Sequence, residues 1–155
     1  MTSWFDLYST DIAGKEDEDG IKTAFNLVNT IITEEIKRGI PSNRIVLGGF
    51  SQGGALALYT ALSTEHKLAG VVALSCFVPL HKQLSQAEIV NKDTPFLQAH
   101  GDADQVVLFR WGQLSSQLLK SLLTKHTFRK YQGLGHDINY QMMDDVKDFL
   151  AEILK

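Results

Sequence analysis

One stretch, residues 45–62, constrains the fold more than any other part of the chain. Apolar Ile45-Val46-Leu47 leads into the glycine-rich run Gly48-Gly49-Phe50-Ser51-Gln52-Gly53-Gly54, and an apolar helical pattern follows from Ala55 to Leu62. A short apolar run with β-branched residues and polar neighbours is typical of a strand buried on both faces. The stretch therefore predicts a strand that turns sharply into a helix, with Ser51 at the turn.

The turn itself fits a known catalytic pattern, Gly-x-Ser-x-Gly, at residues 49–53. In this pattern the serine lies on a strained turn, and glycines two residues to either side remove Cβ atoms that would collide there. The N-terminus of the following helix directs N–H groups at negative charge that develops beside the serine. We therefore expect Ser51 to be a nucleophile and the N–H of Gln52 to be an oxyanion donor.

Two other interpretations of the turn are weaker. Gly-x-Ser-x-Gly also occurs by chance, so the loop could be a glycine-rich turn with an idle serine, but the preceding strand and following helix argue against this. Gly48 and Gly53 have the spacing of a phosphate-binding loop. However, Gly54-Ala55 stand where such a loop needs lysine and then serine or threonine.

Composition excludes several classes of function. With 155 residues, 44% of them hydrophobic, the chain is expected to form a single domain over 1–155. A net charge of −3 gives no electrostatic footprint for nucleic acid. The longest apolar stretch, Leu68 to Leu80, is too short to span a bilayer, and the first residues lack a signal-peptide pattern. Cys76 is the single cysteine, which suits a reducing compartment and predicts a cytoplasmic protein.

Strand and helix patterns alternate along the chain, which predicts parallel βαβ units and an α/β fold. Residues 1–14 are expected to be irregular, with Trp4, Phe5 and Leu7 as their core contacts, and 81–93 to be a surface loop or flap. The acidic run 16–19 is expected to begin a helix, not to bind metal, because consecutive carboxylates on a helix point in different directions. The predicted helices are 21–36, 55–62, 111–122 and 142–153, and the predicted strands are 45–47, 68–75, 95–100 and 127–131.

Polar residues suited to nucleophilic catalysis follow the predicted strands. Ser51 follows the first strand, Asp102 and Asp104 the third, and His136 the fourth, so all meet at the carboxyl edge of the sheet. The chain order Ser, Asp, His is that of the α/β-hydrolases. We expect His136 to remove the Ser51 proton while an aspartate orients the imidazole. Spacing alone does not choose between the two aspartates. The remaining histidines lack such placement, and His100 is expected to be structural.

Short motifs spread over the whole chain support a family resemblance. They are Trp4-Phe5-Asp6, Gly20-Ile21, Gly39 to Ile45, Gly48 to Ala55, Leu74-Ser75, His100 to Asp104 and Gly135-His136. Together they resemble the acyl-protein thioesterases, which belong to the lysophospholipase/carboxylesterase group of serine hydrolases. The Gly48 to Gly54 block is the most specific of these motifs.

The resemblance implies an α/β-hydrolase fold, a three-layer sandwich around a mostly parallel sheet. In this family the catalytic acid is the second aspartate of His-Gly-Asp-x-Asp, which is Asp104 here. Members cleave thioesters and esters of long acyl chains, including S-palmitoyl cysteine, and need no cofactor. The expected substrates are therefore S-acylated proteins or lysophospholipids. Cys76 and Phe77, after the second strand, could line an acyl channel, although core packing is the simpler interpretation.

The sequence departs from the family at its start. Members have N-terminal strands and a His-Gly-x-Gly-Asp loop whose N–H is a second oxyanion donor, whereas this sequence begins at the Trp-Phe-Asp segment. Losing one donor costs about 10²–10³-fold in turnover. We also expect strand 45–47 to be an exposed sheet edge, open to pairing with a second copy of the chain. The alternative function is a catalytically weak form that acts as an acyl-binding or structural module.

Overall fold

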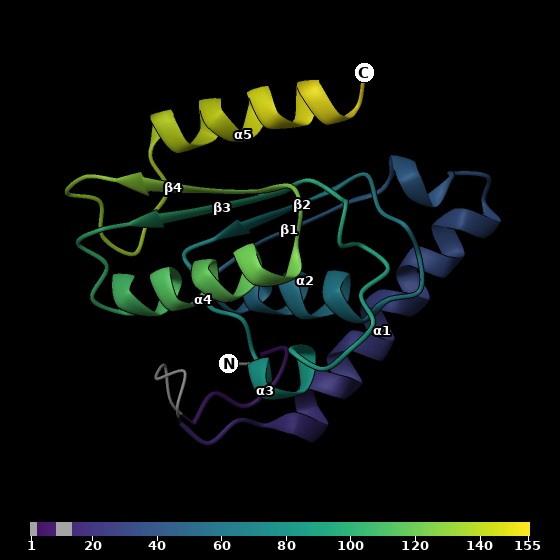
Figure 1. Ribbon diagram of the computed structural model, residues 1–155, viewed down its shortest axis with the longest axis horizontal. Coiled ribbons are helices and arrows are strands. Elements are labelled where there is room, and N and C mark those ends of the chain that lie inside the picture. Colours follow the sequence, from purple (N-terminus) through teal and green to yellow (C-terminus); the bar gives the residue numbers. More distant parts are fainter. Residues whose placement is uncertain (1–2, 9–13) are drawn as a thin grey trace.

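The computed structural model describes residues 3–8 and 14–155, and its centre is a parallel four-stranded sheet (Figure 1). Each strand pairs with the next one in the chain, so the sheet order is β1-β2-β3-β4. The prediction of parallel βαβ units is confirmed. The strands are β1 Val46–Phe50, β2 Gly70–Leu74, β3 Phe96–Gly101 and β4 His126–Tyr131.

Helices cover both faces of this sheet, which gives three layers. On one face lie α2 (Gln52–Ser63) and α4 (Phe109–Leu122), with α1 (Glu18–Lys37) packed outside α2 (Figure 1). On the other face lies α5 (Tyr140–Ile153). Because side chains alternate along a strand, Val71 and Ala73 of β2 join the larger core under α2, and Val72 and Leu74 join the core under α5.

Local signals in the sequence set the ends of α1 as predicted. The Asp17 carboxylate accepts a hydrogen bond from the Gly20 N–H and caps the helix, and acidic residues occupy the first turn. After Lys37 in the last turn, Gly39 has a φ of 101°, which is the left-handed conformation that stops a helix. The apolar face of α1 then packs against α2.

The strand before Ser51 differs from its prediction in length and burial. β1 runs from Val46 to Phe50 and so includes both Gly48 and Gly49, which the sequence pattern assigned to the turn. The expectation of burial on both faces is wrong, since every β1 residue is at least partly exposed. Within residues 3–8 and 14–155, β1 pairs on one side only, with β2. The other side of β1 is a sheet edge, as the comparison with the family motif predicted.

Two segments outside the predicted helices and strands contact the core. Residues 81–93 begin with the short helix α3 (His81–Leu84), and buried Asn91 donates to the carbonyls of Ala61 and His66, so the segment is bound to the core. Of residues 1–14, numbers 1–2 and 9–13 lie outside the described part. Phe5 is buried as expected, but Trp4 and Leu7 are about half exposed, at 48% and 49%.

Candidate active site

Ser51 lies on a strained turn between β1 and α2. Its backbone has φ 55° and ψ −121°, a conformation that non-glycine residues rarely adopt. The Ser51 N–H donates to the carbonyl of Leu74 at 2.8 Å, which ties the turn to the end of β2. The turn therefore presents the hydroxyl at the carboxyl edge of the sheet, where the sequence placed it.

Glycines around Ser51 allow α2 to approach β1 closely. A Cβ on Gly49 would collide with the backbone of Gly53, and one on Gly54 would lie 2.8 Å from the Gly49 carbonyl oxygen. By contrast, a Cβ on Gly53 would meet nothing nearer than Trp4 Nε1 at 3.9 Å. The expected steric need for glycine thus holds at Gly49, while on the helix side it falls on Gly54 rather than Gly53.

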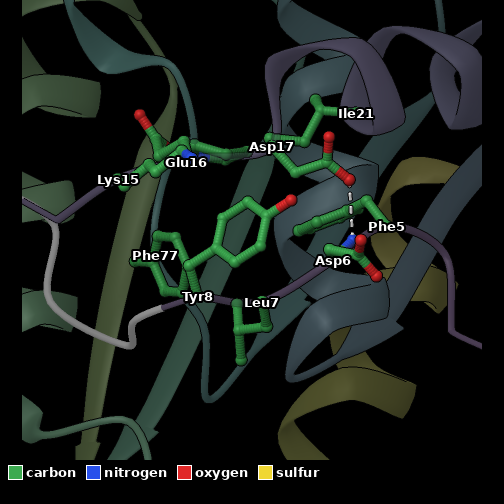
Figure 2. Close-up of a pocket in the computed structure, with 10 residues that line it drawn as sticks. Phe5, Asp6, Leu7, Tyr8, Lys15, Glu16, Asp17, Ile21 and Phe77 are labelled. Carbon is green, nitrogen blue, oxygen red and sulfur yellow. Dashed lines mark hydrogen bonds between the residues drawn. The ribbon is translucent and has the colours of Figure 1, made fainter.

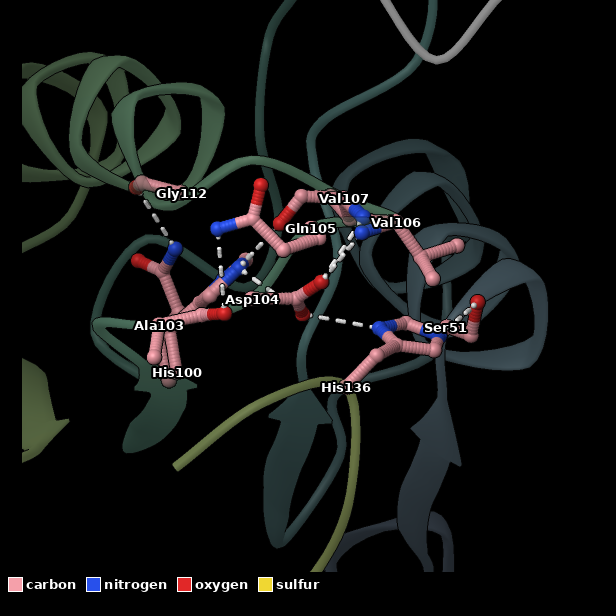
Figure 3. A network of polar contacts seen from close by, with 10 residues as sticks. Ser51, His100, Ala103, Asp104, Gln105, Val106, Val107, Gly112 and His136 are labelled. Carbon is pink, nitrogen blue, oxygen red and sulfur yellow. Dashed lines mark hydrogen bonds and ion pairs between the residues drawn. The ribbon is translucent and has the colours of Figure 1, made fainter. Parts of the chain in front are cut away.

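Three side chains from different strand ends form a hydrogen-bonded line (Figure 3). His136 Nε2 lies 3.0 Å from Ser51 Oγ, and His136 Nδ1 lies 2.7 Å from Asp104 Oδ2. The Asp104 side chain is 0% exposed and that of His136 is 16% exposed. The Phe50 ring packs against the His136 ring, with centroids 4.7 Å apart, and so limits the rotation of the imidazole. A buried carboxylate therefore faces a partly exposed imidazole and hydroxyl.

The two aspartates that spacing left open occupy different positions. Asp104 Oδ1 accepts hydrogen bonds from the N–H groups of Val106 and Val107, each at 2.9 Å, which leaves Oδ2 directed at His136. Asp102 Oδ1 instead accepts from the Gly133 N–H at 2.7 Å and so closes the turn before His136. The acid beside His136 is Asp104, the residue that the family resemblance selected.

Gln52 has a role at the site that its position in the motif did not reveal. Its N–H belongs to the first turn of α2, where helix N–H groups have no partner within the helix. Its side chain binds the N-terminal segment at two points, since Oε1 accepts from the Trp4 N–H at 3.0 Å and Nε2 donates to the Phe5 carbonyl at 2.8 Å. The residue after the nucleophile thus also clamps residues 4–5 beside the turn.

The clamped segment forms one wall of a pocket, shown in Figure 2. Its lining combines Phe5, Leu7, Tyr8 and Phe77 with the charged residues Asp6, Lys15, Glu16 and Asp17, and Tyr8 lies between Phe5 and Phe77 in this view. Of the two residues predicted to line an acyl channel, the structure places Phe77 in this lining. Cys76 is only 1% exposed and packs in the core under α2, where burial raises the pKa of its thiol.

Known proteins of one family resemble this chain over its whole length. A family model described as phospholipase/carboxylesterase matches residues 1–154. The chain belongs to this family. It is 42% identical to acyl-protein thioesterase 1 of Neurospora crassa, over 99% of this chain and 66% of that protein. It is also 42% identical to acyl-protein thioesterase 1 homolog 1 of Dictyostelium discoideum, over 99% of this chain and 69% of that protein. The predicted family is therefore confirmed.

Solved structures agree with this assignment. The crystal structure of Arabidopsis thaliana SOBER1 superposes on this family member with a TM-score of 0.92 at 33% identity, over 99% of this chain and 74% of that one. Zea mays acyl-protein thioesterase 2 superposes with a TM-score of 0.83 at 27% identity. The predicted α/β-hydrolase fold is confirmed, and the chain spans about two thirds of the length of the Neurospora crassa relative.

Two features are absent from the described residues. No helix in 14–155 combines the length and apolarity needed to cross a membrane. Across the same part of the chain and residues 3–8, no group of three or more histidine, cysteine, aspartate or glutamate side chains is arranged to hold a metal ion.

Proposed function

We propose that this chain is a serine hydrolase that cleaves thioesters and esters of long acyl chains, with S-acylated proteins or lysophospholipids as substrates. The observation that supports this most is the line of hydrogen bonds from Asp104 through His136 to Ser51. Relatives named as acyl-protein thioesterases favour a thioester of an acylated protein as the first substrate to test. All the groups that the reaction needs are side chains and backbone N–H groups, so no cofactor is invoked.

In this proposal each residue of the line has one task. His136 Nε2 accepts the Ser51 hydroxyl proton as the oxygen attacks the acyl carbonyl, and returns the proton to the thiol or alcohol that leaves. Asp104 accepts a hydrogen bond from the His136 Nδ1–H. This bond fixes the tautomer of the imidazole and stabilises the imidazolium that forms. Water activated by His136 then attacks the acyl-enzyme and releases the fatty acid. Buried Asp104 cannot exchange its partner for solvent, which keeps the imidazole aligned.

The proposed oxyanion donor is the Gln52 N–H. At the start of α2 it is free of helical bonds and lies on the positive end of the helix dipole. The proposed contact for the acyl chain is Phe77, which lines a pocket together with Phe5 and Tyr8.

Labelling with a fluorophosphonate probe tests the proposal directly, because the probe reacts only with an activated serine. We expect the purified chain to be labelled, and Ser51→Ala and His136→Ala to abolish both labelling and hydrolysis of a palmitoyl thioester. Ser63→Ala is the matched control, since Ser63 is an exposed serine at the far end of α2. A folded, monodisperse sample that is not labelled would contradict the catalytic proposal.

One observation favours a second candidate function, a weakly catalytic acyl-binding or structural module. β1 pairs on one side only in the described part of the chain, and its residues are partly exposed. Such an edge can accept a strand from a second copy, which would make association the main property of the chain. Fatty-acid binding and self-association without Ser51-dependent turnover would support this candidate over the first.

A further inference from the structure

A second histidine reaches the catalytic acid from the side opposite His136. His100 lies near the end of β3 and is 0% exposed. Its Nε2 is 2.8 Å from the carbonyl oxygen of Val107 and 3.4 Å from Asp104 Oδ2, the oxygen that faces His136 (Figure 3). The imidazole of His100 thus contacts the Asp104 carboxylate and also the backbone of Val107, whose N–H donates a hydrogen bond to that carboxylate.

The neighbours of the His100 ring determine which of its two nitrogens carries the hydrogen. Both neighbours of Nε2 are acceptors, a carbonyl and a carboxylate oxygen, so Nε2 bears the hydrogen. Nδ1 has no hydrogen-bond partner among the described residues and faces Gly112 of α4, where an added Cβ would collide with it. A proton on Nδ1 would be buried without an acceptor, so the ring is neutral. Burial accordingly lowers the pKa of His100.

A neutral ring with its proton on Nε2 is a fixed donor to the acid segment. It anchors the Val107 carbonyl, and the N–H of the same residue donates to Asp104 Oδ1. The 3.4 Å contact also places the Nε2–H beside Oδ2. Rotation of the Asp104 carboxylate would therefore have to break contacts at both of its oxygens. The ring itself cannot shift toward α4, because Gly112 leaves no space behind it.

We propose that His100 is a positioning residue for the catalytic acid: its Nε2–H holds the Asp104–Val107 segment so that Oδ2 points at His136. The inference rests on the proposed function, since the alignment matters for turnover only if the line from Asp104 to Ser51 is catalytic. It also explains why a histidine, rather than a larger apolar residue, fills this fully buried position beside a glycine.

A matched pair of substitutions tests the donor. In His100→Gln the side-chain amide nitrogen can occupy the place of Nε2, whereas in His100→Asn it reaches only the place of Nδ1, away from Val107 and Asp104. We expect His100→Asn to lower kcat roughly 10- to 100-fold, because the substitution misaligns Asp104. KM should be nearly unchanged, because the substrate pocket is not altered. His100→Gln should keep most of the wild-type kcat.

A second measurement keeps the test independent of turnover. The His136 Nδ1 proton, bonded to Asp104 at 2.7 Å, should give a downfield proton resonance in the wild type and in His100→Gln, and a weakened one in His100→Asn. Equal kcat values and equal resonances in the two variants would overturn the inference, as would a loss confined to KM. If the wild type is not labelled at Ser51 while the resonance still differs between the variants, the proposed function fails and the positioning role stands.

Discussion

The strands that lead to Ser51 and to Asp104 are supported in different ways. All six residues of β3 are buried, and β3 is paired on both sides, with β2 and β4. No residue of β1 is fully buried, and within the described residues β1 is paired only with β2. The proposed acid is therefore placed by the centre of the sheet, and the proposed nucleophile by its edge.

The difference fits the task of each group. A carboxylate that orients an imidazole needs fixed geometry and exclusion of water, which a buried central strand provides. A nucleophile must meet substrate, so its turn has to be accessible. On its face β1 is supported by α2, because Gly49 and Gly54 let this helix approach the strand closely and α2 is largely buried.

The largest expected effect comes from the acid itself. Asp104→Asn should lower kcat by about 10⁴-fold, because an amide can favour the wrong tautomer of His136. Asp102→Asn is the matched control two residues away. Its carboxylate accepts from the Gly133 N–H and lies 3.8 Å from Lys130 Nζ, so activity should change by no more than a few-fold. Steady-state hydrolysis of a thioester substrate measures both, and comparable losses would contradict the assignment of the acid.

Matched leucines sharpen the comparison of the strands. Leu97 of β3 is 2% exposed, whereas Leu47 of β1 is partly buried at the edge. Leu97→Ala should lower the free energy of unfolding by about 3 kcal/mol, the usual cost of emptying a fully buried leucine site. Leu47→Ala should cost roughly 1 kcal/mol, because less apolar surface is lost. Urea unfolding measures both values, and an equal cost would mean that the β1 edge is covered in solution.

The sequence was sufficient to predict the order of the helices and strands and the meeting of Ser51, Asp104 and His136 at one edge of the sheet. The prediction succeeded because apolar periodicity and glycine punctuation are local, and because parallel strands bring their carboxyl ends together wherever their side chains point. It could not separate Asp102 from Asp104 by spacing, since both follow the same strand. That choice depends on which carboxylate the N–H groups of Val106 and Val107 can reach, a feature of the folded loop.

Other features could not be predicted from the sequence, because they depend on contacts that form only in the folded chain. Gly48 and Gly49 were assigned to the turn, yet both belong to β1, and it is the missing side chain of Gly49 that lets α2 approach the strand. The clamp from Gln52 to residues 4–5 joins positions more than forty residues apart, and no periodic pattern reports such a contact. His100 was expected to be structural because a Gly-Asp turn follows it. Only its distance to Asp104 suggests more.

A charge on the edge strand tests whether β1 mediates association. Gly48 is exposed, and a Cβ there would make only an ordinary contact with Val72, at 3.7 Å. Gly48→Lys should reduce self-association, because a lysine on an edge opposes pairing with a second strand. Gln113→Lys, at an exposed site on α4, adds the same charge elsewhere and should have no such effect. Sedimentation over a concentration series compares them, and an identical response to both would remove β1 as the interface.

The smallest expected effect is a pH dependence at β4, which lies at the opposite edge of the sheet from β1. Burial, with a smaller contribution from Lys120, lowers the pKa of His126 at the start of β4 from 6.5 to about 4. Between these values the unfolded chain binds a proton at His126 that the folded chain does not, so stability falls as pH drops from 6.5 toward 4. β1 contains no histidine and adds nothing to this dependence.

In His126→Gln the side chain keeps a donor for Gln98 Oε1, which His126 Nε2 meets at 3.0 Å, but it cannot titrate. The urea midpoint of this variant should therefore fall less than that of the wild type between pH 7 and pH 5. A residual fall is expected, since the pKa of buried His100 is lowered as well and acts in the same direction. Parallel curves for variant and wild type would contradict this prediction, because they would show that His126 is protonated in the folded chain without loss of stability.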